Sequence, residues 1–179
     1  TGAAALAGIG DAAAIEVLST HPSSGVRSAA VVALRRLHHP GVAAFLADAE
    51  PAIVTDAARA INDDGGIAAA VPQLAERLGT APVTNEPLVR RALNANLRLG
   101  TAAAVARIES FARDAAHPSD LRVEAASALG VWGAPSPMDR VDGFHHDSVT
   151  IAAQRPSSAA ARPARTSTRR DAAAARAAV

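Results

Sequence analysis

Residues 26–37 read VRSAAVVALRRL, and this stretch decides the fold. Its small and aliphatic residues recur at steps of 0, 3, 4, 7, 8 and 11, which places them on one face of an α-helix. That face consists of Val26, Ala29, Ala30, Ala33, Leu34 and Leu37. The stretch is therefore an amphipathic helix that needs a neighbour to cover it.

The same pattern recurs further along the chain, led by Val54, Val89 and Leu121. The spacings from Val26 onward are 28, 35 and 32 residues, which is the period of a two-helix repeat. The end of the pattern also appears in residues 5–9, so we expect the chain to begin inside such a helix and the repeat domain to be truncated at its N-terminus.

Weaker amphipathic segments lie between these helices and provide the first helix of each pair. They cover residues 12–19, 41–47, 67–78 and 102–113. Prolines precede the leading residues by two to four positions, where a first helical turn tolerates them. These are Pro22, Pro51, Pro87 and Pro118. Pro72 lies inside a first-helix pattern and should kink that helix or mark its real start.

The pattern predicts an all-α fold, an α-α superhelix or HEAT-like solenoid of about four helix pairs over residues 1–134. An alanine-dominated composition with 2% aromatic residues favours such layers, because alanine buries little area per residue. After Trp132 the period stops, so residues 135–153 should form an irregular exit segment. Residues 154–179 are rich in Ala and Arg without an apolar face, which predicts a disordered tail.

Several function classes find no support in the sequence. The absence of cysteine excludes disulfides, thiolate nucleophiles and Cys-ligated metals from this chain. Charged residues interrupt every Ala-rich run, so no membrane span is expected. No nucleophile triad, P-loop or GxGxxG pattern occurs, and we predict no catalytic, cofactor-binding or metal site. The adjacent histidines at 38–39 and 145–146 point in different directions. Residues 63–66 (DDGG) offer too few oxygens for calcium, and we expect the Asp63–Asp64 pair to form a turn and to cap the next helix.

Arginines recur at one position of the repeat, directly after the leading apolar residue. Arg27, Arg90 and Arg122 occupy it, and Arg91 lies beside one of them. Such a series could bind an anion or nucleic acid, because each repeat adds one charge. The alternative, which we favour, is pairing with carboxylates of neighbouring repeats, since residues 1–154 carry 16 acidic residues against 12 arginines.

Three further residues stand out on the predicted helices. Asn94 and Asn96 are unusual in a second helix, and Asn96 falls on its apolar face, where it needs backbone partners from a loop or an adjoining repeat. Trp132 takes an apolar position in the last recognisable helix and should cap the stack.

Alternating short helices with VRSAAVVALRRL and LRVEAASALGVWG as second helices resemble bacterial HEAT-like repeats. A narrower similarity lies in ARAINDDGGI, EPLVRRALNANLRLG and VWGAPSPMDRVDG, which resemble the HEAT segment of bacterial secreted proteins that combine a propeller, HEAT repeats and a haem-binding cytochrome c domain. That resemblance implies a connector or scaffold in a periplasmic or secreted protein; without it, a cytoplasmic location is expected. The propeller and the CxxCH motif are not in this sequence.

The predicted function is a non-catalytic scaffold that contacts a protein partner or other domains of a parent chain. One alternative is a nucleic-acid-binding module that uses the repeated arginines and the basic tail. A second alternative is the connector of a larger haem-containing, dehydrogenase-like protein.

Overall fold

The computed structural model describes residues 2–63 and 66–145. Within these residues the chain is all-α, as predicted, and the only β-type pairing is an isolated antiparallel bridge between Met138 and His145. None of the described helices is both long and apolar enough to cross a membrane.

The helices with the leading pattern are α1 (Gly2–Ile9), α3 (Ser24–Arg36), α4 (Pro51–Asn62), α6 (Glu86–Leu99) and α8 (Ser119–Gly130). They include the two longest of the described helices, α3 and α6, and we refer to this set as the longer helices. Between them lie short α-helices, 3-10 helices and one helix of 12 residues, which is as long as α4 and α8. These are α2 (Ala12–Glu16), η1 (Val17–Thr20), η2 (Pro40–Ala47), η3 (Ala68–Ala70), α5 (Val71–Glu76) and α7 (Ala102–Arg113). Each predicted segment of residues 12–113 therefore coincides with a helical element.

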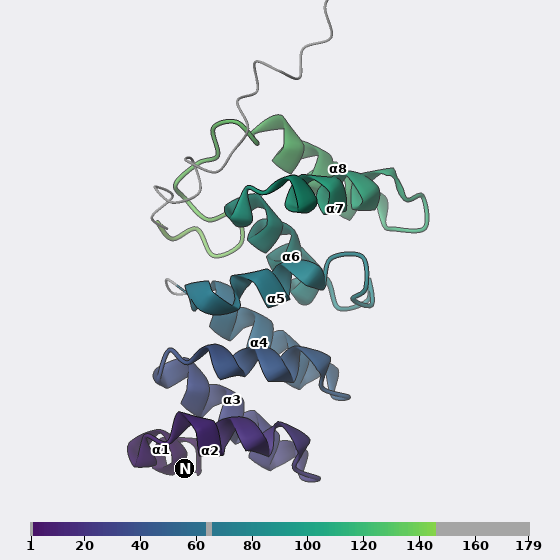
Figure 1. Cartoon of the computed structure of the whole chain (residues 1–179). Coiled ribbons are helices and arrows are strands. Elements are labelled where there is room, and N and C mark those ends of the chain that lie inside the picture. The colour runs from purple at the N-terminus through teal and green to yellow at the C-terminus, as the bar shows by residue number, and fades with distance from the viewer. Residues whose placement is uncertain (1, 64–65, 146–179) are drawn as a thin grey trace, which may run out of the picture.

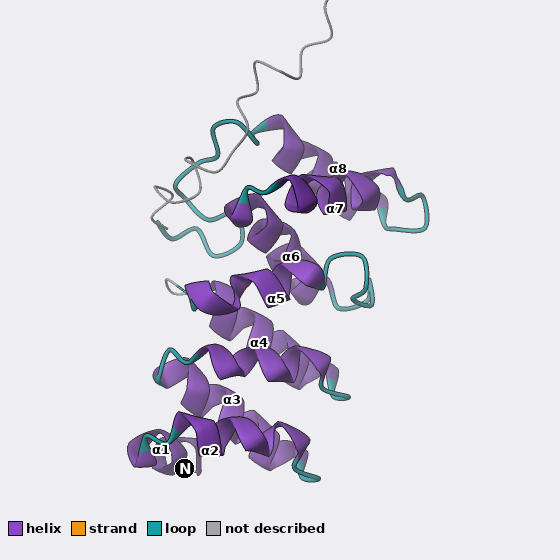
Figure 2. Ribbon diagram, in the orientation of Figure 1, coloured by secondary structure: helices purple, strands orange, loops and turns teal. Residues whose placement is uncertain are grey.

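The longer helices pack against one another in chain order, α1 on α3, α3 on α4, α4 on α6 and α6 on α8. The intervening elements pack beside them, with η2 against α4, α5 against α6 and α7 against α8. Figure 1 shows the resulting layers rising from the N-terminal end, and Figure 2 shows that turns join them at the edges. One continuous core follows the stack from Ile15 to Ala128.

Local sequence explains where these elements begin. Pro51 and Pro87 each occupy the first turn of a longer helix, and Pro72 does the same for α5. Pro72 therefore marks the real start of that helix, one of the two outcomes the sequence allowed. Residues 40–47 form a 3-10 helix, in which Val42 and Phe45 lie three apart and are both fully buried, as three residues per turn permits.

Residues 131–145, which follow α8, form turns and are anchored to the stack. Trp132 lies partly buried against the core. Asp139 is buried, and its backbone amide donates to the Phe144 carbonyl at 2.8 Å. The remainder of the predicted exit segment and the whole of the predicted tail, residues 146–179, lie outside the described residues.

Candidate interaction surface

Arg27 on α3 is held by the turn that precedes α4. Its Nε donates to Asp48 Oδ2 at 2.7 Å and its Nη2 to Asp48 Oδ1 at 3.0 Å. Both side chains are largely buried, with 12% and 2% of their surfaces exposed. The hydrogen bonds from Arg27 lower the pKa of Asp48, and the same contact raises the pKa of Arg27.

Arg90 on α6 joins two neighbouring longer helices. Its Nε donates to Glu86 on the same helix at 2.8 Å, and its guanidinium pairs with Glu124 and lies 3.8 Å from Asp120, both on α8. The hydrogen bond to Glu86 and the charges of all three carboxylates raise its pKa. Arg90 therefore pairs with carboxylates of its own helix and of α8, one of the two roles considered for these arginines from the sequence.

Arg91 reaches in the opposite direction, to the end of α4. Its Nε and Nη2 donate to the two carboxyl oxygens of Asp63 at 2.9 and 2.7 Å. Asp63 is the C-cap of α4, and Ile67 is the N-cap of the following 3-10 helix. The sequence suggested that the Asp63–Asp64 pair caps that next helix, which is wrong for Asp63; Asp64 lies outside the described residues.

Arg122 on α8 binds within its own pair, where its Nε donates to the Ala112 carbonyl of α7 at 3.0 Å. The arginines at the repeated position thus have different partners. Arg27 binds the turn before α4, Arg90 binds carboxylates of α6 and α8, and Arg122 binds a backbone carbonyl of α7. Their shared position in the repeat did not predict these partners, because the partner depends on which acceptor the adjoining layer presents.

A buried amide network connects α4, α6 and the exit segment. Asn94 Nδ2 donates to Asn62 Oδ1 at 2.9 Å and to Asp139 Oδ2 at 2.6 Å. Asn96, fully buried, donates to the carbonyls of Ala75 and Ala92 at 2.8 Å each. Asn96 is thus buried with backbone partners, but these lie in α5 and in α6 itself instead of in a loop or an adjoining pair. Its contact with the next pair is the Arg107 Nε, which donates to Asn96 Oδ1 at 2.8 Å.

Arg98 lies at the edge of this network and was not singled out from the sequence. Its Nη1 is shielded from solvent, and burial lowers its pKa, an effect that the charges of Asp139 and Asp142 partly offset. The approach of the exit segment to α6 therefore adds electrostatic as well as hydrogen-bonding contacts.

His38 and His39 lie at helix ends, whereas His145 takes part in the bridge to Met138 and His146 lies outside the described residues. His38 follows α3 with a left-handed φ of 49°, and the Nδ1 of His39 accepts from the Gly41 amide at 3.1 Å where η2 begins. In the part of the chain that the structure describes, no three His, Asp or Glu side chains gather as a metal site would require.

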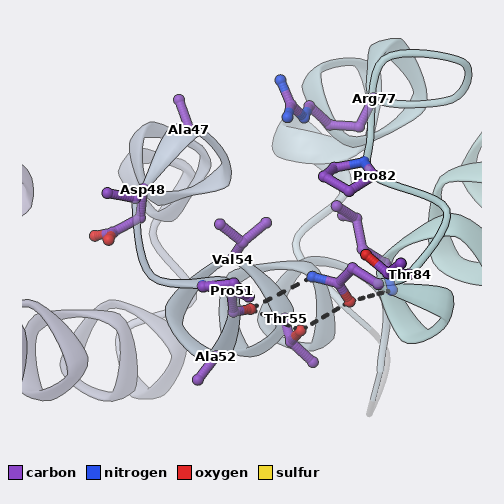
Figure 3. Close-up of a pocket in the computed structure, with 12 residues that line it drawn as sticks. Ala47, Asp48, Pro51, Ala52, Val54, Thr55, Arg77, Pro82 and Thr84 are labelled. Carbon is purple, nitrogen blue, oxygen red and sulfur yellow. Dashed lines mark hydrogen bonds between the residues drawn. The ribbon is translucent and has the colours of Figure 1, made fainter.

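A hollow of about 400 Å³ opens between two layers, at the edge where α4 and α6 begin (Figure 3). Its lining comes from the η2–α4 turn, the first turns of α4, and the α5–α6 connection. The lining residues are Ala47, Asp48, Ala49, Pro51, Ala52, Val54, Thr55, Arg77, Pro82, Thr84, Asn85 and Leu88. No sequence pattern marked this hollow, because its residues come from separate parts of the chain.

The hollow has a fixed polar base. Thr55 Oγ1 lies 2.9 Å from the Pro51 carbonyl and 3.0 Å from Asn85 Oδ1, which also accepts from the Leu88 amide at 3.3 Å. Asn85 therefore caps α6 and ties its start to α4 at the same time.

Comparison with known proteins found no matching family model, no matching curated protein and no matching solved structure.

Proposed function

We propose that this chain is a non-catalytic, protein-binding scaffold built as an α-α superhelix of HEAT-like helix pairs. The ordered packing of the longer helices, with the intervening elements beside them, supports this architecture. Such stacks offer repeated edges and hollows between layers, and they recognise partners by shape and charge.

The observation that carries the proposal is how the repeated arginines are used. Arg27 forms a bidentate ion pair with Asp48, and Arg91 forms one with Asp63. Arg90 forms an ion pair with Glu124 of α8. A guanidinium already bound to a carboxylate has to break that contact before it can bind a phosphate. This favours a protein scaffold over the nucleic-acid-binding alternative, whose basic tail lies outside the described residues.

The connector of a haem-containing, dehydrogenase-like protein is a special case of the same proposal. In that case the partner would be another domain of a parent chain, and the hollow and edges would serve the same purpose.

Panning a random peptide library on the immobilised chain tests the proposal. We expect enrichment of peptide families that bind the folded chain reversibly and are lost when it is denatured in urea. A bare support and a chain carrying Phe45→Ala, which removes a fully buried core side chain, are the controls. Failure to enrich any family that requires the folded chain would contradict the proposal.

A further inference from the structure

Arg77 forms part of the wall of the hollow and differs from the arginines that join the layers. It is the C-cap of α5, at the start of the connection to α6. Its Nε is shielded from solvent and has no hydrogen-bond partner among the described residues. A buried donor without a partner is costly, and for a charged group the cost is larger. A ligand does not reach the shielded Nε itself, but Arg77 as a whole is only half-buried and lines the hollow, so its guanidinium offers positive charge there.

The only other charged residue in the lining is Asp48, and it is already neutralised. Its two carboxyl oxygens bind Arg27 on the far side of the turn. Figure 3 shows the Asp48 carboxyl pointing away from the hollow, whereas the Arg77 side chain extends from its own ribbon toward Ala47. The charge that the hollow presents to a ligand is therefore positive.

The rest of the lining suits a short stretch of polypeptide. Pro51, Ala52 and Pro82 provide exposed apolar surface, and Thr84 adds a hydroxyl near the Thr55–Asn85 base. A volume of about 400 Å³ lies at the small end of ligand pockets and accommodates one or two side chains. The hollow is open along the edge of the stack, so the chain that carries those side chains can continue on either side.

We propose that this hollow binds an acidic side chain, glutamate or aspartate, of an extended segment from a protein partner. Arg77 donates to the carboxylate, and the apolar lining receives the aliphatic neighbour of the acidic residue. A guanidinium matches a carboxylate with two parallel hydrogen bonds, which gives specificity for this group over a neutral amide. This inference rests on the proposed protein-binding function and names the chemistry of the partner.

Titrations followed by ¹⁵N NMR test the inference. The probes are the peptide acetyl-Ala-Leu-Glu-Leu-Ala-amide and its counterpart with Gln in place of Glu. We expect the Glu peptide to shift the backbone amides of Thr84 and Asn85 and the Nε–H signal of Arg77. The Gln peptide should bind about tenfold or more weakly, because it loses a charge-assisted hydrogen bond.

Two variants separate the role of Arg77 from a general loss of positive charge. Arg77→Gln should weaken the binding of the Glu peptide by a similar factor. Arg59→Gln, the matched control, removes an arginine whose side chain is 46% exposed and pairs with Asp56 on the outside of α4, and it should bind as the parent chain does. The Glu and Gln peptides are compared on the unaltered protein, so the test holds even if Arg77→Gln impairs folding.

Three outcomes would overturn the inference: equal binding of the two peptides, shifts confined to residues outside the hollow, or acetate displacing the Glu peptide at equal concentration. The last would indicate a site for small anions instead of a peptide. If library panning enriches peptides whose binding does not depend on Arg77, this inference fails and the scaffold proposal stands. If panning enriches nothing, the scaffold proposal fails as well.

Discussion

The α4–α6 interface and the α1–α3 interface are built from different kinds of contact. Between α4 and α6, Thr55 meets Asn85 near the start of both helices, and Asn62, the last residue of α4, meets Asn94 in the second half of α6. The Arg91–Asp63 ion pair lies in the same interface. By contrast, α1 buries no residue and packs against the core through partly buried side chains such as Leu6.

This contrast shows how a core in which alanine is the most frequent residue can specify one arrangement. Alanine-rich faces interlock less firmly than faces of larger side chains, so polar contacts help to set the alignment. Directional contacts at two separate places along α4 and α6 fix the alignment of the two helices. We expect the α4–α6 interface to be the rigid centre of the stack and α1 to be its weakest element.

The largest expected effect contrasts one leucine from each region. Leu93→Ala in α6 removes a side chain that is 1% exposed and should lower the free energy of unfolding by about 2–5 kcal/mol. Leu6→Ala in α1 should cost less than about 1 kcal/mol, because that side chain is only partly buried. Urea unfolding followed by circular dichroism measures both, and equal costs would contradict the contrast.

Breaking the ion pair of the α4–α6 interface should come next. Arg91→Ala leaves Asp63 without its partner in a site where only 15% of the Asp63 side chain is exposed, and we expect a loss of about 2 kcal/mol. The matched control Arg59→Ala breaks an exposed pair within α4 and should cost about 0.5 kcal/mol or less. A double-mutant cycle with Asp63→Asn should recover most of the difference as coupling energy.

Removing the buried amide between α4, α6 and the exit segment should have a somewhat smaller effect. Asn94→Ala leaves Asn62 Oδ1 and Asp139 Oδ2 without this donor, and we expect a cost of about 1–2 kcal/mol. Hydrogen exchange should also accelerate at the amides of Asp139 and Gly143, which close the exit turn. Unchanged exchange there would show that Asn94 does not anchor the turn.

A third interface, between α3 and the turn before α4, is held by Arg27 and Asp48 and should respond to pH. The folded-state pKa of Asp48 lies below its ordinary value, so its contribution to stability is present above about pH 4 and is lost as the pH falls through the folded pKa. Asp48→Asn should therefore flatten the decline of stability in acid. Asp56→Asn, an exposed control, should leave that decline unchanged.

The sequence predicted the elements of this fold well because their signals are local. The recurrence of small and aliphatic residues located α3, α4, α6 and α8, and the prolines located where several helices begin. Pro72 was left with two roles, and the start of α5 at Val71 decides between them.

The candidate surface was much less accessible from the sequence. Arg27 finds Asp48 across 21 residues, Arg91 finds Asp63 across 28, and Asn94 finds Asp139 across 45. Such partners are chosen by the packing of layers, and no local pattern encodes them. The same applies to Arg77, which stands out because it lines the hollow and its Nε has no hydrogen-bond partner among the described residues.

The protein-binding scaffold and the nucleic-acid-binding module differ in what the repeated arginines bind. In the scaffold they bind acceptors within the stack, and in the nucleic-acid-binding module they bind an external polyanion. A direct measurement is fluorescence anisotropy of a labelled 20-base-pair DNA duplex titrated with the parent chain and with the Arg27→Gln/Arg90→Gln/Arg122→Gln variant. We expect any DNA affinity of the parent chain to be the same in the variant, because these side chains are bound to the protein's own acceptors. Binding that weakens steeply with salt and disappears in the variant would contradict the scaffold and favour a nucleic-acid-binding module.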